Sequence, residues 1–229
     1  MKISECTLSK ETQDLLYRYF AAAANLNGVI EIGKLLKIYN SQNEPVSEED
    51  FLSFVENMNF KGKYFCVFNQ DDIYDDGSET PALEQEILAE YLYFFEADDD
   101  SLDKYEMLKY RQIGKKFCFL DKEQFLRYEY DCYFKKTPDF LEMRSFLRNE
   151  TGLSKEDADD YANDIMICFA TQPDNSEESV YEVILGSGIY NRDDIAFSHR
   201  KLEYLCQKVM YTSARLHVLL GHTPEEIFG

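Results

Sequence analysis

The stretch LNGVIEIGKLLKIYN, residues 26–40, decides how the N-terminal part of this chain folds. Asn27 and Gly28 are residue types that end helices, and the β-branched run that follows them at 29–32 favours a short strand. After Gly33, apolar residues recur at the spacing of one helix face. The stretch therefore predicts the end of one helix, a short strand and the start of a second helix.

The segments on either side extend this order of elements. Upstream, Ser9 is a suitable N-cap for the first helix, and downstream Ser47 is a suitable N-cap for a third. The segments KYFCVF (63–68) and DIYDD (72–76) alternate as the two strands of a hairpin do. The order helix, strand, helix, turn, helix, strand, strand predicts a winged-helix-like unit with a small β-hairpin over residues 1–77.

Beyond residue 77 the sequence pattern is almost wholly helical. We expect an acidic helical connector over 78–110, in which a helix begins at Pro81, followed by a helical domain over 111–229. The apolar residues that recur at helical spacing in the connector are Leu83, Ile87, Tyr91, Phe94 and Phe95.

Capping residues mark the helices of the C-terminal part. Asp121, Thr137 and Ser154 are N-cap residues, and the apolar stripe at the end of the chain predicts one long helix over 198–220. The predicted fold class is therefore mainly α, of the α+β kind, with a winged-helix-like N-terminal unit and an all-helical C-terminal domain.

The charge of the chain limits the partners that it can bind. The 229 residues carry a formal net charge of −20, which repels phosphate backbones and favours protein partners, cations or basic surfaces. The N-terminal segment holds no apolar run of a secretory signal, and no apolar run elsewhere is long enough to span a membrane. The six cysteines are scattered singly, as in a cytoplasmic protein with reduced thiols. We therefore expect a cytoplasmic protein without membrane contact.

The third helix of a winged-helix unit is the one that reads DNA in many gene regulators. Here that helix is SEEDFLSFVENM (47–58), which holds four acidic residues and no basic one, and the hairpin turn adds Asp71 and Asp72. Such a surface would set anions against the phosphates and release no counterions. We therefore expect no direct reading of a DNA groove by this face.

Two routes to nucleic-acid-linked regulation remain open in the sequence. Residues 71–106 hold fourteen acidic side chains against one lysine, which is a charge density that a DNA mimic would need. Residues 109–148 carry ten of the 24 basic side chains, interleaved with Phe and Tyr, and could follow an anionic strand. The alternative interpretation of these segments is ordinary solvated faces whose charges pair with one another.

The end of the chain, YTSARLHVLLGHTPEEIFG (211–229), holds the candidate binding residues, which are Arg215, His217 and His222. Arg215 could hold a carboxylate or phosphate of a ligand, or it could pair with a neighbouring acid of the chain. Gly221 is suited to a left-handed turn, and the residues from 223 onward begin a new helix with a capping box.

The sequence contains no recognisable catalytic or cofactor motif. No serine lies in G-x-S-x-G, and no glycine-rich loop follows a strand to cradle phosphates. His199, Glu203 and Cys206 recur at i, i+4 and i+7, but no paired cysteine or H-E-x-x-H supports a metal site. We therefore predict no catalytic residues, no metal and no cofactor.

Three segments together resemble a group of Firmicutes proteins related to those that carry an SEC-C zinc motif. The segments are LNGVIEIGKLLKIYN, GKKFCFLDKEQFLRYEYDCYF (114–134) and TSARLHVLLGHTPEEIFG (212–229). The resemblance implies that Arg215 and the Gly-His-Thr-Pro turn at 221–224 belong to a shared pattern, and it implies no particular activity. This sequence departs from the group in the residues at 212–214 and in lacking the zinc-binding tail after Gly229.

These observations favour a non-enzymatic protein that binds another protein, or itself, through helical surfaces. A nucleic-acid-linked regulator is the second hypothesis, acting as a DNA mimic through 71–106 or binding through the faces at 109–148. An enzyme with a pocket near Arg215 and His222 is the third.

Overall fold

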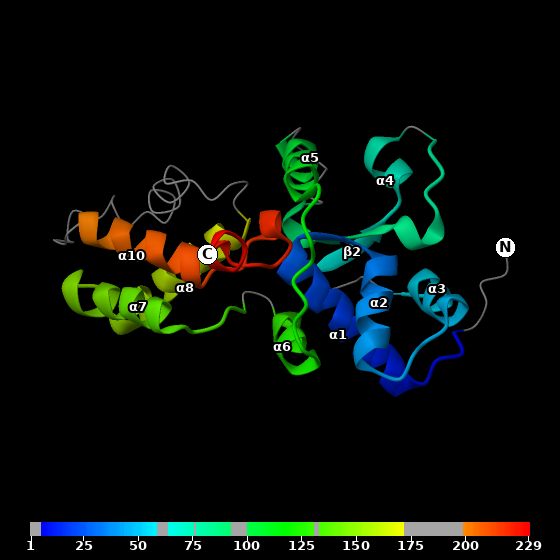
Figure 1. Cartoon of the computed structure of the whole chain (residues 1–229), viewed down its shortest axis with the longest axis horizontal. Coiled ribbons are helices and arrows are strands. Elements are labelled where there is room, and N and C mark those ends of the chain that lie inside the picture. Colours follow the sequence, from blue (N-terminus) through cyan, green and yellow to red (C-terminus); the bar gives the residue numbers. More distant parts are fainter. Residues whose placement is uncertain (1–5, 59–63, 76, 93–99, 131–132, 172–198) are drawn as a thin grey trace. The chain divides into compact units, whose positions relative to one another are not determined.

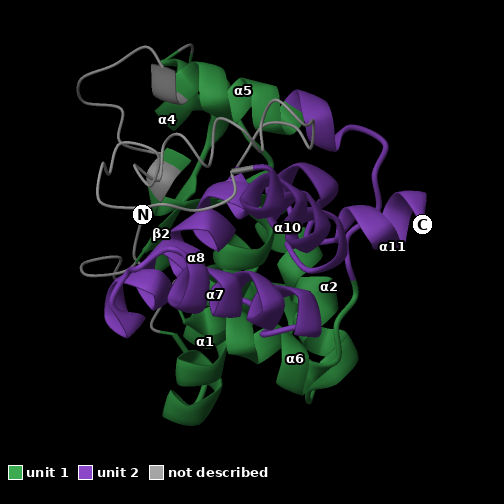
Figure 2. Ribbon diagram, turned by 90° about the vertical axis from the view of Figure 1, so that its left-hand side faces the viewer, with its two compact units in different colours: residues 1–109, 119–133 green, residues 110–118, 134–229 purple. Residues whose placement is uncertain are grey.

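The computed structural model describes residues 6–58, 64–75, 77–92, 100–130, 133–171 and 199–229. Within these residues the chain is mainly helical, with ten α-helices and a small three-stranded antiparallel sheet in its N-terminal part. The chain divides into two compact units, coloured separately in Figure 2. The first unit comprises residues 1–109 and 119–133, and the second comprises 110–118 and 134–229.

The first unit begins with the elements that the opening stretch predicts (Figure 1). Helix α1 (Lys10–Asn27) starts after Ser9, whose hydroxyl accepts the N–H of Thr12, and it ends at Gly28 with φ of 71°. Strand β1 (Val29–Glu31) and helix α2 (Ile32–Gln42) follow directly. The predicted order of helix end, strand and helix start is confirmed, because caps and a left-handed glycine are local signals.

The sheet is completed by two strands from further along the chain. Helix α3 (Glu48–Glu56) begins after Ser47, and strands β2 (Phe65–Phe68) and β3 (Glu86–Ala89) follow it. The strand order is β1-β3-β2, with β3 antiparallel to both neighbours. The strand predicted at 63–68 is therefore confirmed in β2.

The predicted partner of that strand is wrong. Residues 72–75 do not form a strand, and residue 76 lies outside the described residues. Helix α4 (Gln70–Tyr74) lies there, started by Asn69, whose N–H donates to the carboxylate of Asp72 at 2.8 Å. The capping box overrides the alternation of apolar and polar residues.

The helix predicted from Pro81 is also wrong. The chain there forms the 3₁₀ helix η1 (Ala82–Glu84), then β3, then the 3₁₀ helix η2 (Glu90–Leu92). All four residues of β3 are buried, because it is the central strand and lies between two others. A short buried run of this kind cannot be told from a helix by periodicity alone. Phe94 and Phe95, which were expected on the same helix, lie outside the described residues.

The predicted division of the chain therefore differs from the observed one. The boundary at residue 77 falls inside the first unit, because β3 pairs with β1 and β2. The segment 78–110 is no separate connector: it supplies β3 and most of helix α5 (Asp100–Gln112) to the first unit. Residues 119–133 return to that unit with helix α6 (Lys122–Leu126) and the 3₁₀ helix η3 (Arg127–Glu129), which pack against α1.

Aromatic side chains form the core of the first unit. The ring of Phe20 lies 5.8 Å from that of Phe51 and 5.9 Å from that of Phe65, and all three side chains are almost fully buried. Tyr19 packs against Phe125 of α6 at 5.2 Å. Burial of each such side chain stabilises the fold by about 1.5–3 kcal/mol, so this cluster holds α1, α3 and β2 together.

The second unit is built from three long helices that lie side by side: α7 (Pro138–Glu150), α8 (Lys155–Thr171) and α10 (His199–Thr212) (Figure 1). Phe140, Phe169 and Leu205 are buried in its core. The N-caps predicted at Asp121 and Thr137 are confirmed, since each side chain accepts a backbone N–H three residues on.

The last long helix is shorter than predicted. Helix α10 ends at Thr212 rather than at residue 220, and the 3₁₀ helix η5 (His217–Leu219) and helix α11 (Pro224–Phe228) follow. The N–H groups of Ser213 and Ala214 both donate to the carbonyl of Val209, which closes the helix end. The apolar residues after 212 are buried in this turn instead of along a helix face.

Among the described residues, no helix combines the length and the apolar character that crossing a membrane requires.

Candidate functional site

The turn between α10 and α11 brings two of the predicted binding residues together. Leu216 and His222 form an isolated antiparallel bridge, in which the N–H of Leu216 donates to the carbonyl of His222 at 3.0 Å. Leu220 and Gly221 both have positive φ, 52° and 82°, so the chain reverses sharply between the bridge residues. The N–H of Cys118 donates to the carbonyl of Leu220 at 3.0 Å and fixes a second segment of the unit against this turn.

Helix α11 begins with the capping box that the sequence predicts. The hydroxyl of Thr223 accepts the N–H of Glu226 at 3.2 Å, and the carboxylate of Glu226 accepts the N–H of Thr223 at 3.2 Å. This reciprocal pair fixes the side chain of Glu226 so that it turns back toward the preceding loop.

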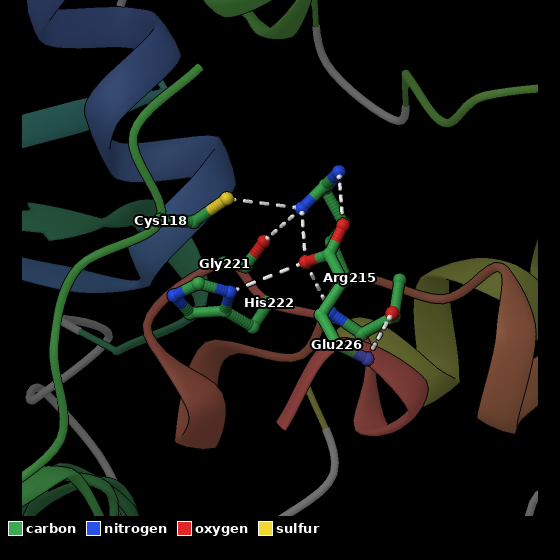
Figure 3. Close-up of polar contacts among 6 residues, drawn as sticks. Cys118, Arg215, Gly221, His222 and Glu226 are labelled. Atoms are coloured by element: carbon green, nitrogen blue, oxygen red, sulfur yellow. Dashed lines mark hydrogen bonds and ion pairs between the residues drawn. The ribbon is translucent and has the colours of Figure 1, made fainter. Parts of the chain in front are cut away.

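Arg215 is the centre of the site (Figure 3). Its Nη1 and Nη2 atoms lie 3.1 and 3.0 Å from the two carboxylate oxygens of Glu226, in a bidentate pair. Nη1 also donates to the carbonyl of Gly221 at 2.7 Å and lies 3.1 Å from Sγ of Cys118. The side chain is only 17% exposed, so its charge is neutralised inside the protein. We call Cys118, Arg215, Gly221, His222 and Glu226 the C-terminal clasp.

Glu226 joins Arg215 to His222. Its Oε2 atom lies 3.2 Å from Nδ1 of His222. Partial burial raises the pKa of Glu226, but the hydrogen bonds and the charge of Arg215 outweigh burial and hold that pKa below its ordinary value. The carboxylate is therefore ionised at neutral pH, as the bidentate pair requires.

Cys118 is a thiol rather than a thiolate in this setting. Burial raises its pKa, and the nearby Arg215 only partly opposes that rise. Reactive cysteines need a lowered pKa and access to solvent, and Cys118 is buried. The clasp therefore does not present a nucleophile.

The clasp contains a set of side chains that could ligate a metal. Ligand atoms of Cys118, His222 and Glu226 all lie within 4.8 Å of one another, and sulfur, imidazole and carboxylate are the donors that zinc takes. However, the guanidinium of Arg215 already contacts Cys118 and Glu226. A metal ion could bind only after this cation had moved away, so the geometry fits an internal ion pair better than a metal centre.

The other predicted residues lie elsewhere. His217 belongs to η5 and is 4% exposed, and its carbonyl accepts Nε2 of Gln112 at 2.9 Å. It contributes to the packed interior of the second unit. Of the spaced triple on α10, the Sγ atom of Cys206 is fully buried and lies 3.7 Å from Sδ of Met143. Its thiol therefore points into the core.

Sequence reasoning missed two members of the clasp. The sequence pattern indicates only a capping-box role for Glu226, although its position four residues after His222 puts both on one side of the turn. Cys118 lies 97 residues before Arg215, and nothing in its local sequence indicates that contact. The arrangement neutralises Arg215 within the chain, as the alternative of pairing with a neighbouring acid predicted.

Comparison with protein-family models, with curated proteins and with solved structures finds no match for this chain. The resemblance to the Firmicutes proteins therefore stays a prediction.

Proposed function

We propose that this protein is a non-enzymatic interaction module whose first unit has winged-helix topology and binds a basic protein surface instead of DNA. The order α1-β1-α2-α3-β2-α4-β3, with the sheet order β1-β3-β2, supports the topology. In this interpretation α3 is the helix that other such units place in the DNA groove, and residues 69–75 and 77–85 belong to the wing segment.

The observation that carries the proposal is the charge of α3. Its buried side holds Phe51, Phe54 and Val55, while Glu48, Glu49 and Glu56 are exposed. No basic residue lies on the helix. DNA binding gains most of its affinity from lysine and arginine that release counterions, so this face would weaken rather than support binding to a phosphate backbone.

Asp50 adds to the same negative surface. Its carboxylate accepts hydrogen bonds from the hydroxyls of Ser47, at 2.6 Å, and Thr7. These hydrogen bonds lower the pKa of Asp50, so the group is charged at neutral pH. The wing segment contributes the exposed residues Asp71 and Asp72. A surface of this kind complements lysine and arginine on a protein partner.

The basic segment 109–148 offers less support for binding an anionic strand. Arg148 forms a bidentate pair with Asp159, and Arg144 lies 4.0 Å from the same carboxylate. Arg127 pairs with Glu123 at 2.6 Å. These basic side chains therefore pair with acidic side chains of the same chain. Mimicry of DNA through 71–106 remains our second proposal, since its partner would also be a basic protein.

Affinity capture with a matched pair of variants tests the proposal. The test variant is Glu48→Gln/Glu49→Gln/Glu56→Gln, and the control removes the same charge at exposed acids elsewhere, as Glu11→Gln/Glu156→Gln/Glu225→Gln. Quantitative mass spectrometry should show basic proteins that wild type and control retain and the α3 variant loses. Circular dichroism checks that both variants remain folded.

A captured partner, once purified, then distinguishes an ordinary protein-binding surface from mimicry of DNA. Displacement of that partner by duplex DNA indicates mimicry, whereas indifference to DNA indicates an ordinary protein surface. The proposal fails if the α3 variant and the control capture the same proteins, or if wild type shifts duplex DNA at about 50 mM salt, where non-specific DNA binding is strong.

A further inference from the structure

A cavity of about 260 Å³ lies in the first unit, where one end of the sheet meets the wing segment and α5. Its lining includes three carboxylates, those of Glu31, Glu84 and Glu86, and one cation, Lys109. Aromatic walls come from β2, α4 and α5. We call this the sheet-end cavity.

The register of the sheet sets two of the carboxylates side by side. Glu86 of β3 is paired with Glu31 of β1 on one side and with Phe68 of β2 on the other. Like charges directly opposite each other across a strand pair are destabilising. Lys34 pairs with Glu31 at 2.7 Å and Lys109 pairs with Glu86, which offsets part of this repulsion.

Glu86 is held in a fixed geometry at the floor of the cavity. It is 9% exposed, and the hydroxyl of Tyr105 donates to its Oε2 atom at 2.6 Å, while Lys109 contacts Oε1. Burial together with this hydrogen bond raises the pKa of Tyr105, so the phenol remains a neutral donor. The buried carboxylate is therefore preorganised before any ligand arrives.

The third carboxylate of the lining belongs to an exposed residue. Glu84 is exposed at the end of η1, on the segment that leads into β3. Lys34 and Lys109 pair with Glu31 and Glu86, so Glu84 supplies the remaining negative charge of the lining, which favours a cation over an anion.

The aromatic walls indicate what kind of cation fits. The rings of Tyr74 and Tyr105 lie 6.5 Å apart at 60°, and Nζ of Lys109 lies 5.9 Å from the centre of the Tyr105 ring. Cations on organic groups use such ring faces as well as carboxylates. Among the described residues, three metal-ligating side chains with ligand atoms within 4.8 Å of one another occur at the C-terminal clasp and not in this cavity. The ligand atoms of the three carboxylates therefore do not all lie within 4.8 Å of one another, which favours an organic cation over a metal ion held by all three.

We infer that the sheet-end cavity binds an organic cation, a guanidinium or alkylammonium group that contacts the carboxylates and lies against the tyrosine rings. The group can belong to a free small molecule or to an arginine or lysine side chain of another protein. This inference goes beyond the proposed function and does not depend on α3.

Isothermal titration calorimetry on the full chain tests it. The probes are agmatine, as a free guanidinium compound, and the peptide acetyl-Gly-Arg-Gly-amide, with N-acetylglutamate as an anionic control. Glu84→Gln is the test variant, because Glu84 is exposed and its loss leaves the buried network intact. Glu79→Gln is the matched control, an exposed acid on the same wing segment outside the cavity lining.

We expect at least one cationic probe to bind wild type and Glu79→Gln equally, and to bind Glu84→Gln about fivefold more weakly, as for loss of one partly exposed charge pair. Binding of agmatine assigns the site to small molecules as well, whereas binding of the peptide alone assigns it to a protein side chain. The inference is overturned if neither cation binds, if N-acetylglutamate binds as well as they do, or if both variants weaken binding equally. Because α3 is unchanged in these variants, failure here leaves the proposed function standing.

Discussion

Arg215 shows how a single side chain can hold the end of the chain in place. Its guanidinium contacts Glu226, Gly221 and Cys118, which lie on α11, on the turn and on a segment far back in the sequence. The capping box orients Glu226 toward this cation. The same carboxylate therefore caps α11 and pairs with Arg215. The clasp therefore stabilises α11, a helix too short to be stable alone.

The charge of Glu226 is separable from its role as a helix cap. Glu226→Gln keeps a residue that completes a capping box but removes the ion pair with Arg215. We expect the free energy of unfolding to fall by about 1 kcal/mol, since the pair is partly exposed. Glu225→Gln, at an exposed neighbour, should change it by less than about 0.5 kcal/mol. Urea unfolding measures both; equal effects would show that the pair does not stabilise the unit.

The same pair predicts a dependence on pH. Because the folded pKa of Glu226 lies below its unfolded value, the stabilisation is complete above the unfolded value, about 4.3. It is lost as pH falls further, through the folded pKa. The difference in urea midpoint between wild type and Glu226→Gln should therefore be constant from neutral pH to about 5 and shrink below about 4.3. A difference that already disappears near neutral pH would contradict this assignment.

At the scale of elements, the segment from α4 to β3 is where tertiary contacts decide the structure. Residues 70–89 hold a short helix, a 3₁₀ turn and the central strand, although their pattern predicts a strand followed by a helix. The return of the chain to the sheet also requires a close approach at Gly33 of α2. A Cβ atom there would lie 2.8 Å from the carbonyl oxygen of Leu83. The glycine thus permits η1 to pack directly on α2.

Gly33→Ala tests this packing, because we expect it to lower the free energy of unfolding, whereas alanine in place of glycine usually raises it in a helix. Alanine normally stabilises a helix over glycine by about 0.5–1 kcal/mol. Here the added methyl group would collide with the backbone of Leu83, which would have to shift. We therefore expect the free energy of unfolding to fall by about 1 kcal/mol or more, as for overpacking. Lys37→Ala, at an exposed position of the same helix, controls for helix propensity. A Gly33→Ala protein that resists urea better than wild type would show that η1 does not approach α2 in this way.

At the scale of the whole molecule, charge and chain path are the main features. The two units are interleaved in sequence, since residues 110–118 belong to the second unit and 119–133 to the first. A truncation at any point between residues 110 and 133 would therefore remove part of both units. The net charge of −20 means that like charges repel one another on average over the chain.

Screening this repulsion should stabilise the protein. Raising NaCl from about 20 mM to about 300 mM shortens the Debye length to below 10 Å, which weakens repulsion among exposed carboxylates. We expect the unfolding temperature to rise by roughly 2–4 °C, equivalent to about 1 kcal/mol. Differential scanning calorimetry measures the shift, with KCl at equal ionic strength as the control. A rise in one salt alone would indicate binding of a specific cation instead of screening.

The sequence by itself determined the elements whose signals are local. Ser9, Ser47, Thr137 and Thr223 begin helices as predicted, because an N-cap bonds to backbone two or three residues away. The turn at Gly221 follows for the same reason, since only local sterics set its φ. The grouping of Arg215 with His222 was also visible, because the two lie close together in the chain.

Tertiary structure alone decided β3, the end of α10 and the contact between Arg215 and Cys118. An apolar run such as EILA becomes a strand because β1 and β2 satisfy its backbone groups on both sides, and those strands come from distant segments. Cys118 reaches Arg215, and Glu86 meets Glu31 and Lys109, only after the chain has folded. The sequence pattern predicts hydrogen bonds between near neighbours. The burial and pairing of remote residues arise only once each unit has folded.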